Sequence, residues 1–175
     1  MSPIIENPSP NYDERRLPVS MIVIHYTETK TCELALRILC DGSAPKRVSA
    51  HWLIDRDGTV YRLVDESKRA WHAGKSFWHG IEDCNSASIG IELVNDGAEE
   101  YPQPQLDALA ELCAGIKSRY DIRDIVGHSD IAPDRKHDPG PLFPWGWLGE
   151  IMLGGMMHSS YNEYMVSECS KEETK

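Results

Sequence analysis

The stretch Met21-Ile-Val-Ile-His-Tyr-Thr27 (MIVIHYT) is the strongest indication of the fold in this sequence. It is a short run of mostly β-branched apolar residues that ends on polar ones, a pattern typical of a buried strand. The run Ser88–Asn95 (SIGIELVN) repeats the pattern, and Ile125–His128 (IVGH) is a third, shorter case. The sequence therefore predicts three buried strands, two of which carry a histidine near their end, His25 and His128.

Helical patterns lie between these strands. The segments Cys32–Cys40 and Gln103–Tyr120 space their apolar residues three and four apart, which predicts helices with one buried face. In the first helix, Leu34 and Ile38 are expected on that face, and Gly42 marks the end. Strands that alternate with helices predict an α/β fold: a single domain with a mixed central β-sheet flanked by helices.

Several connections complete the expected order of elements. Two β-rich runs flank Arg56-Asp57-Gly58, a turn signal that predicts a hairpin. Ser67–Ser86 has no regular pattern and is expected to be a long loop, and Ser129–Pro144 is a second loop, with four prolines. Trp145–Leu153 is expected to form a short closing helix. The expected division of the chain is an extended N-terminal arm at 1–19, a domain at 20–150 and a poorly ordered C-terminal tail at 151–175.

Composition and charge exclude some partners. The chain has 175 residues, 41% of them hydrophobic and 26% charged, which suits one globular domain. Its formal net charge of -10 argues against nucleic acid or an anionic membrane surface as the partner. No apolar run approaches the ~20 residues of a membrane span. The five cysteines form no CxxC pair, so we interpret them as free thiols rather than as a thiolate zinc site.

Three side chains could together form a metal site. His25 and His128 stand near strand ends, and Asp138 lies in a loop stiffened by prolines. Two histidines and one carboxylate from separate rigid elements suit a single zinc ion, with a fourth position open for water. No HExxH motif is present, so the common zinc-protease arrangement does not apply. Spacing alone leaves a structural role open for each of the three residues.

Six short motifs span most of residues 20 to 148. They are IVIHYT (22–27), SAH (49–51), RAWHAG (69–74), NSASIGIE (85–92), GHSDIAP (127–133) and RKHDPG (135–140). In order and spacing they strongly resemble the type-2 N-acetylmuramoyl-L-alanine amidase family. The resemblance implies zinc-dependent hydrolysis of the amide bond between N-acetylmuramic acid and L-alanine in peptidoglycan or muropeptides. It also implies that His25, His128 and Asp138 bind one Zn²⁺ at the strand ends, and that Glu92 and Lys136 are catalytic.

The two implied catalytic roles agree with the chemistry of the residues. A carboxylate beside the metal can take a proton from the attacking water and pass it to the leaving amine. Glu92 shares a strand face with Gly90, which leaves space beside it. A lysine two residues before a metal ligand, as Lys136 is, can stabilise the oxyanion of the intermediate. The alternatives are an exposed strand charge for Glu92 and loop solubility for Lys136.

The long loop carries the expected substrate contacts. The resemblance assigns Trp71, His72 and Asn85 to the substrate cleft, with plain loop packing as the alternative for each. We interpret His51 as a structural histidine, with a cleft-lining role as the alternative. His137 is not expected to bind the metal, because neighbouring loop residues usually point apart.

Other functions stay open at this stage. A peptidoglycan-recognition module of the same fold would bind muropeptides without cutting them, and a related amidase would act on an unrelated small amide. The intact ligand set favours the enzyme. The expected partner is a peptidoglycan or muropeptide substrate, with no nucleic acid and no membrane span, and a monomer is expected. The lack of a signal peptide slightly favours the cytoplasm, whereas a removed export signal would place the protein in the periplasm.

Overall fold

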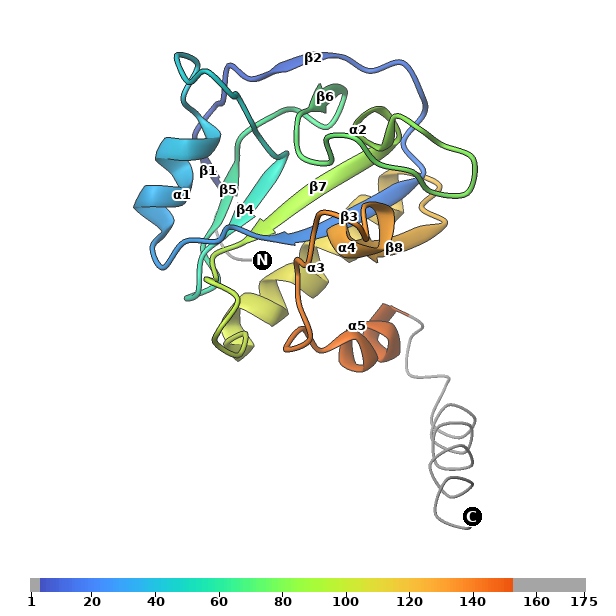
Figure 1. Ribbon diagram of the computed structural model, residues 1–175. Helices are drawn as coiled ribbons and strands as arrows, with labels where there is room; N and C mark the ends of the chain where they lie inside the picture. The colour runs from blue at the N-terminus through green and yellow to red at the C-terminus, as the bar shows by residue number, and fades with distance from the viewer. Residues whose placement is uncertain (1–3, 153–175) are drawn as a thin grey trace, which may run out of the picture. The chain divides into compact units, whose positions relative to one another are not determined.

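The computed structural model describes residues 4–152, and its centre is a six-stranded sheet. All neighbouring strands are parallel except β4 and β5, which form an antiparallel hairpin, so the sheet is mixed. The strands lie in the order β1 (Ile4–Glu6), β5 (Val60–Arg62), β4 (Trp52–Ile54), β7 (Ser88–Leu93), β3 (Met21–Tyr26) and β8 (Asp124–Gly127). The predicted α/β fold with a mixed central sheet is confirmed (Figure 1).

Two adjacent inner strands of the sheet, β3 and β7, are the apolar runs that stand out in the sequence. Every residue of β7 is buried, and in β3 only Tyr26 is partly exposed. Their parallel register pairs His25 with Glu92 and Val23 with Gly90. Because parallel strands end at the same edge of a sheet, this register brings His25 and Glu92 together at the carboxyl edge of β3 and β7.

The helix α1 (Cys32–Leu39) lies where the sequence predicts it, but a neighbouring face is buried. Ala35 and Leu39 pack into a cluster with Leu53 of β4, whereas Leu34 and Ile38 are 37% and 44% exposed. The prediction of the buried face is therefore wrong: the buried residues, Ala35 and Leu39, each follow the predicted ones by one position. The two candidate rows are adjacent on the helix, and only the packing against the sheet decides between them.

Three further helices belong to the same part of the molecule: α3 (Gln103–Arg119), α2 (Cys84–Ala87) and α4 (His128–Ile131). In Figure 1 the long helix α3, in yellow, passes behind the sheet, and α4, in orange, lies in front of it. Beneath α2 and α4, strand residues such as Met21, Val23 and Val126 form a buried cluster. Side chains of β3 alternate between the faces, so His25 shares the front face with Met21 and Val23.

The segment predicted as a long loop at Ser67–Ser86 is more regular than expected. It begins with β6 (Lys68–Ala70), which pairs antiparallel with β2 (Tyr12–Glu14), and it runs into α2. The loop prediction is therefore wrong at both ends of the segment. The strand depends on a partner more than fifty positions away in the chain, so no local pattern reveals it.

The chain separates into two compact units, and the first of them ends at Phe143. The sheet and α1–α4 belong to the first unit. In the second unit, α5 (Trp145–Met152) is the closing helix that the sequence predicts. The proposed division into arm, domain and tail stays a prediction, because residues 153–175 lie outside the described part. Among the described residues, no helix has the length and hydropathy needed to cross a membrane.

Candidate functional site

Three predicted ligand residues converge at the carboxyl edge of the sheet. His25 is the penultimate residue of β3, and His128 is the first residue of α4, directly after β8. Asp138 comes from the proline-rich loop that follows α4. The backbone of that loop is fixed near the strands because Ser129 N donates to Asp138 O at 2.9 Å. Three separate elements thus deliver one side chain each to a single point.

The ligand atoms of these three residues lie unusually close together. Nδ1 of His25 is 2.9 Å from Oδ2 of Asp138 and 2.9 Å from Nδ1 of His128. Nδ1 of His128 is 3.1 Å from the same Asp138 oxygen. All three side chains are buried, at 1%, 3% and 3% exposure for His25, His128 and Asp138. Among the described residues, these three form a group whose ligand atoms are close enough together to hold a metal ion.

The outer nitrogen of His25 belongs to a chain of hydrogen bonds with a fixed direction. The Ser88 hydroxyl donates to Cys84 O at 2.5 Å, so its oxygen is free to accept from Nε2 of His72 at 3.2 Å. Burial, followed by the charge of His25, lowers the pKa of His72 well below 6.5, so its ring is neutral. Its Nδ1 therefore accepts from Nε2 of His25 at 3.0 Å. This chain places the proton of a neutral His25 on Nε2 and leaves Nδ1 bare.

His128 is oriented in the same sense. Its Nε2 lies 3.1 Å from the carbonyl oxygen of Ala73, which can only accept, and 3.4 Å from Nη2 of Arg135, which can only donate. The shorter contact favours a proton on Nε2. Burial lowers the pKa of His25 to about 4, against the raising effect of Asp138, so that ring is neutral at pH 7. With the proton on Nε2 of each ring, the Nδ1 atoms of His25 and His128 are bare and face the Asp138 carboxylate. Three mutually repelling acceptors in contact require a cation between them, and the donor set fits a metal ion.

The Asp138 carboxylate agrees with this conclusion. Burial by itself raises its pKa, but its contacts with His128 and His25 outweigh burial, and the net pKa is lowered. Those contacts favour the carboxylate only when a positive charge, a proton or a metal ion, lies between it and the two Nδ1 atoms, so the lowered pKa describes an ionised carboxylate beside a shared cation. Its second oxygen, Oδ1, is buried and has no hydrogen-bond partner among residues 4–152. An ionised buried carboxylate with an unpartnered oxygen is costly unless a bound group completes it.

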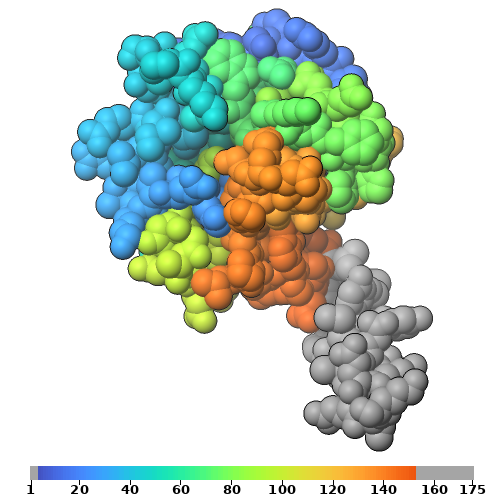
Figure 2. Space-filling view, in the orientation of Figure 1, coloured from blue at the N-terminus to red at the C-terminus, as the bar shows by residue number. Residues whose placement is uncertain are grey.

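A pocket of about 300 Å³ opens beside the three ligands. Figure 2 shows this face, which is hollowed between the light-blue α1 region, the green segment before α2 and the orange segment around the ligand loop. Its lining includes the three ligand residues together with Glu92, Lys136, Trp71 and His72. The structure therefore gathers seven of the eight predicted site residues around one cavity. Asn85 is not among its lining residues.

Glu92 stands next to His25 across the β3–β7 pairing. It is 9% exposed, and its Oε2 is buried without a hydrogen-bond partner in the described chain. Burial, followed by the charge of Asp138, raises the pKa of Glu92 well above 4.5, and the Lys136 ammonium opposes part of that rise. A carboxyl group of this kind binds a proton more readily than a solvated glutamate does. It has the properties that a general base requires.

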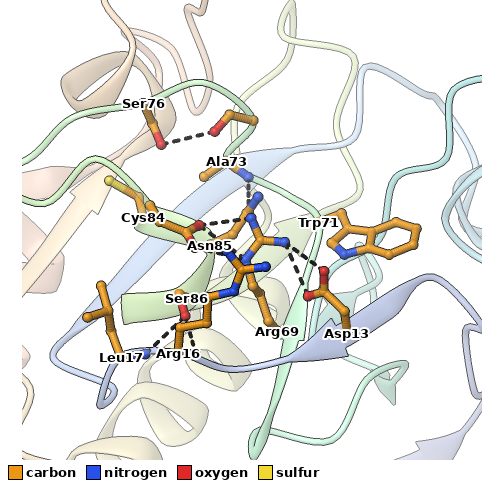
Figure 3. Close-up of polar contacts among 12 residues, drawn as sticks. Asp13, Arg16, Leu17, Arg69, Trp71, Ala73, Ser76, Cys84, Asn85 and Ser86 are labelled. Atoms are coloured by element: carbon orange, nitrogen blue, oxygen red, sulfur yellow. Dashed lines mark hydrogen bonds and ion pairs between the residues drawn. The ribbon is translucent and has the colours of Figure 1, made fainter.

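The loop residues Trp71, His72 and Asn85 occupy three different positions. Trp71 is half-exposed in the pocket wall, and the Arg47 guanidinium lies 5.0 Å from the centre of its ring. His72 is 8% exposed and packs over Gly90, where an added Cβ would lie 2.4 Å from His72 Cγ. The space beside Glu92 that Gly90 was expected to leave is therefore occupied by the His72 ring. Asn85 lies behind the pocket on α2, with its amide oxygen bonded to backbone (Figure 3).

The remaining histidines of this region have other surroundings. His51 is fully buried, and its Nδ1 accepts from Gly90 N at 2.9 Å while its Nε2 contacts Lys68 O at 3.1 Å. Its position agrees with the structural interpretation. His137 is exposed and is not part of the ligand group. His79 is also exposed, with its ring 4.6 Å from that of Trp78.

Sequence reasoning missed Ser88. Its hydroxyl terminates the hydrogen-bond chain that begins at His25. A signal was available, because Ser88, Gly90 and Glu92 occupy alternate positions of an otherwise apolar strand and therefore share one face. Three small or polar residues on one face of a fully buried strand indicate a polar site, not a packed core.

The fold and site together define a class. This is an α/β protein with a buried group of two histidines and one aspartate that could hold a metal ion, at the carboxyl edge of a mixed sheet and beside a buried carboxyl group of raised pKa. Residues 15–141 match the model of the family described as N-acetylmuramoyl-L-alanine amidase. The chain belongs to this family, as its sequence motifs indicate.

Similar proteins carry the same description. AmiD of Escherichia coli is 38% identical over 154 residues, which cover 78% of this chain and 54% of AmiD. The structure of AmiD with the substrate anhydro-N-acetylmuramic acid-L-Ala-D-γ-Glu-L-Lys superposes with a TM-score of 0.72 at 38% identity, over 77% of this chain and 57% of that one. The AmpD enzyme of E. coli, a 1,6-anhydro-N-acetylmuramyl-L-alanine amidase, is 50% identical over 101 residues, which cover 57% of this chain and 55% of AmpD.

A crystal structure of a selenomethionine AmpD derivative has a TM-score of 0.79 at 35% identity, and covers 86% of this chain and 95% of that chain. In contrast, the chain spans only about half the length of the curated sequences AmiD and E. coli AmpD that it matches. The shared part includes all of the candidate site, because the family match extends from residue 15 to residue 141.

Proposed function

We propose that the protein is a zinc-dependent N-acetylmuramoyl-L-alanine amidase that hydrolyses the amide bond between N-acetylmuramic acid and L-alanine. The observation that carries the proposal is the convergence of two bare imidazole nitrogens and one carboxylate oxygen within about 3 Å, with a separate buried carboxyl group beside them. Three nitrogen and oxygen ligands with one open position are typical of catalytic zinc. His25, His128 and Asp138 would hold the ion.

A bound zinc ion would polarise the scissile carbonyl and activate a water molecule for attack at neutral pH. Glu92 would accept the proton of an attacking water molecule while the water oxygen forms its bond to the carbonyl carbon. The raised pKa of Glu92 makes its carboxylate a sufficient base, and the resulting neutral acid can donate the same proton to the amine as the carbon–nitrogen bond breaks. The products are a lactyl carboxylate on the sugar and a free amino group on L-alanine.

Lys136 supports the same reaction by its charge. It is half-buried in the pocket lining, two residues before Asp138, and its ammonium opposes part of the rise in the pKa of Glu92. A fixed positive charge in a poorly solvated cavity stabilises the negative oxygen that develops on the attacked carbonyl. Trp71, half-exposed at the pocket wall, offers an apolar face to a sugar or peptide substrate, and His72 lines the wall beside it.

Muropeptides with an anhydro sugar are the first substrates to test. The complex of AmiD contains an anhydro-N-acetylmuramic acid peptide, and the name of AmpD describes a 1,6-anhydro-N-acetylmuramyl-L-alanine amidase. Intact peptidoglycan is the second, and the compartment in which the protein acts decides which of the two it meets. Mass spectrometry of products from both substrates, incubated in parallel, measures the preference.

Glu92→Gln tests the mechanism. The amide has nearly the shape of the carboxyl group but cannot accept the proton, so we expect kcat to fall about 100-fold or more. Zinc content, measured by atomic absorption on the purified variant, should stay at one ion per chain. A variant that keeps wild-type kcat would overturn the role of Glu92. A protein that binds anhydro-muropeptide equally well with or without chelator, and never cuts it, would be a recognition module instead.

A further inference from the structure

The two outer hydrogen bonds of the ligand histidines end on consecutive residues. Nε2 of His25 is bonded to the side chain of His72, and Nε2 of His128 to the carbonyl of the next residue, Ala73. A single dipeptide thus sets the orientation of both imidazoles and places the proton on the outer nitrogen of each. If that dipeptide shifted, both bare Nδ1 atoms would lose their common direction.

The Asn85 side chain holds both backbone nitrogens of this dipeptide, while the Arg135 guanidinium donates to the carbonyl oxygen of Ala73. Oδ1 of Asn85 accepts from the backbone nitrogen of His72 at 2.9 Å and from that of Ala73 at 2.6 Å. Figure 3 shows the Asn85 side chain directed at the chain segment of Ala73. Asn85 is 5% exposed, so no water replaces these bonds easily. Its amide oxygen is therefore already engaged by the protein rather than by a substrate.

Asn85 itself sits on a fixed base. The Arg15 guanidinium donates to three carbonyl oxygens around α2, those of Asn85, Ser86 and Ser88, at 3.3, 2.6 and 3.0 Å. The hydroxyl of Ser86 accepts from the backbone nitrogens of Arg16 and Leu17 (Figure 3). The N-terminal segment thus immobilises the helix that carries Asn85, while Arg69 joins Asp13 to Asp83 at the start of that helix.

From this arrangement we infer that Asn85 and His72 are positioning residues for the metal: Asn85 fixes the His72–Ala73 dipeptide, which in turn fixes the tautomer and direction of His25 and His128. The inference rests on the proposed metal-dependent function and deepens it. It gives Asn85 a role other than the substrate contact expected from the sequence. Removal of the hydrogen-bond partner of a metal-binding histidine typically weakens metal binding by about 10–100-fold.

The test is the zinc affinity of the full chain, measured by competition with a chromogenic chelator. Asn85→Ala removes the shared acceptor and should weaken zinc binding about 10–100-fold. Asn85→Asp keeps an oxygen in the same place and should stay within about threefold of wild type. A substrate-contact role predicts the opposite pattern: unchanged zinc affinity, with a raised KM for anhydro-muropeptide at saturating zinc. That pattern, or unchanged zinc affinity alone, would overturn the inference.

His72 provides an independent pair of variants, which decides the question if Asn85→Ala does not fold. His72→Ala removes the acceptor for Nε2 of His25 and leaves the bonds of Asn85 to the backbone intact. We expect weaker zinc binding, restored in His72→Asn, whose side-chain oxygen can accept in place of Nδ1. Equal zinc affinity in His72→Ala and wild type contradicts the inference.

Gln105 supplies the matched control. It is another fully buried amide, and its Nε2 donates to the carbonyls of Ile54 and Val94 at 2.9 and 3.2 Å, away from the ligand group. Gln105→Ala should lower the thermal midpoint and leave zinc affinity unchanged. Failure of the proposed function has a different signature, because wild type itself would then bind no zinc or release no L-alanine-terminated peptide.

Discussion

Two hollows in the first compact unit differ in size and in what their polar groups do. The pocket beside the ligand residues has a volume of about 300 Å³. The second, which we call the α3 hollow, measures about 440 Å³ and is lined by Trp52, Arg62, Glu66, Arg119 and other residues along α3. The α3 hollow is thus the larger of the two, although the candidate chemistry lies entirely in the smaller one.

The difference lies in how the buried carboxylates are satisfied. In the α3 hollow, Oε1 of Glu66 accepts from Trp52 Nε1 at 3.0 Å and from Arg119 Nη2 at 2.8 Å, and Oε2 accepts from Arg119 Nε at 3.1 Å. In the pocket, Glu92 and Asp138 each keep one buried oxygen without a partner among residues 4–152. A cavity whose buried polar atoms are all hydrogen-bonded within the protein, which we call balanced, needs no ligand. A cavity with buried carboxylate oxygens that lack a partner, which we call unbalanced, is typical of a ligand-binding site.

The largest expected contrast comes from removing one carboxylate from each hollow. Asp138→Ala deletes a metal ligand. Loss of a ligand's hydrogen-bond partner weakens metal binding by about 10–100-fold, and we expect loss of the ligand itself to weaken zinc binding by more than that. The amidase activity should fall together with zinc binding. Glu66→Gln changes the α3 hollow by one atom and should leave zinc content and kcat at wild-type values. Zinc analysis and muropeptide turnover, measured on both variants, make the comparison. Loss of turnover in Glu66→Gln would show that the α3 hollow takes part in function.

How much of this the sequence could predict depends on the range of the interactions. The buried strands, their order with the helices and the ligands at the sheet edge all follow from local patterns and from the family motifs. The His72–Ser88 contact does not, because it depends on the β7 strand passing beneath the RAWHAG segment. The β2–β6 pairing and the buried face of α1 were missed for the same reason: each is decided by a distant partner.

Metal binding should stabilise the protein, and this effect also distinguishes the pocket from the α3 hollow. Zinc that binds the folded chain and not the unfolded one stabilises it by mass action, so zinc at 100 times its Kd should raise the free energy of unfolding by about 2.7 kcal/mol. Thermal denaturation with added zinc, and after treatment with chelator, measures this. Asp138→Ala should show no such increase, whereas Glu66→Gln should show all of it. An increase of equal size in Asp138→Ala would place the ion elsewhere.

In the α3 hollow, substitution of Glu66 should change only the stability of the protein. Glu66→Gln retains an oxygen for Trp52 but loses the charge that pairs with Arg119, whose side chain is 47% exposed. Solvent screening on the Arg119 side reduces the loss, and we expect about 1–2 kcal/mol in the free energy of unfolding. Urea denaturation at neutral pH measures it. A loss near zero would mean that the ion pair contributes nothing beyond the neutral hydrogen bond.

His51 extends the comparison to a histidine whose two nitrogens are both satisfied within the protein, unlike the bare Nδ1 of His25. Burial, followed by the charge of Arg15, lowers the pKa of His51 from 6.5 to about 3. Between these values the unfolded chain binds a proton that the folded protein does not. The stability linked to His51 is therefore complete above pH 6.5 and is lost progressively as the pH falls toward 3.

The expected cost is about 1.4 kcal/mol for each pH unit below the unfolded pKa, since one proton is involved. His51→Asn cannot titrate, so its free energy of unfolding should decline less steeply than that of wild type by this amount per unit. Urea denaturation of both proteins at pH 7.5, 6.5 and 5.5 gives the two slopes, and the other buried histidines cancel in the difference. Identical slopes would mean that the folded protein accepts a proton on His51, and that its surroundings are not balanced for the neutral ring alone.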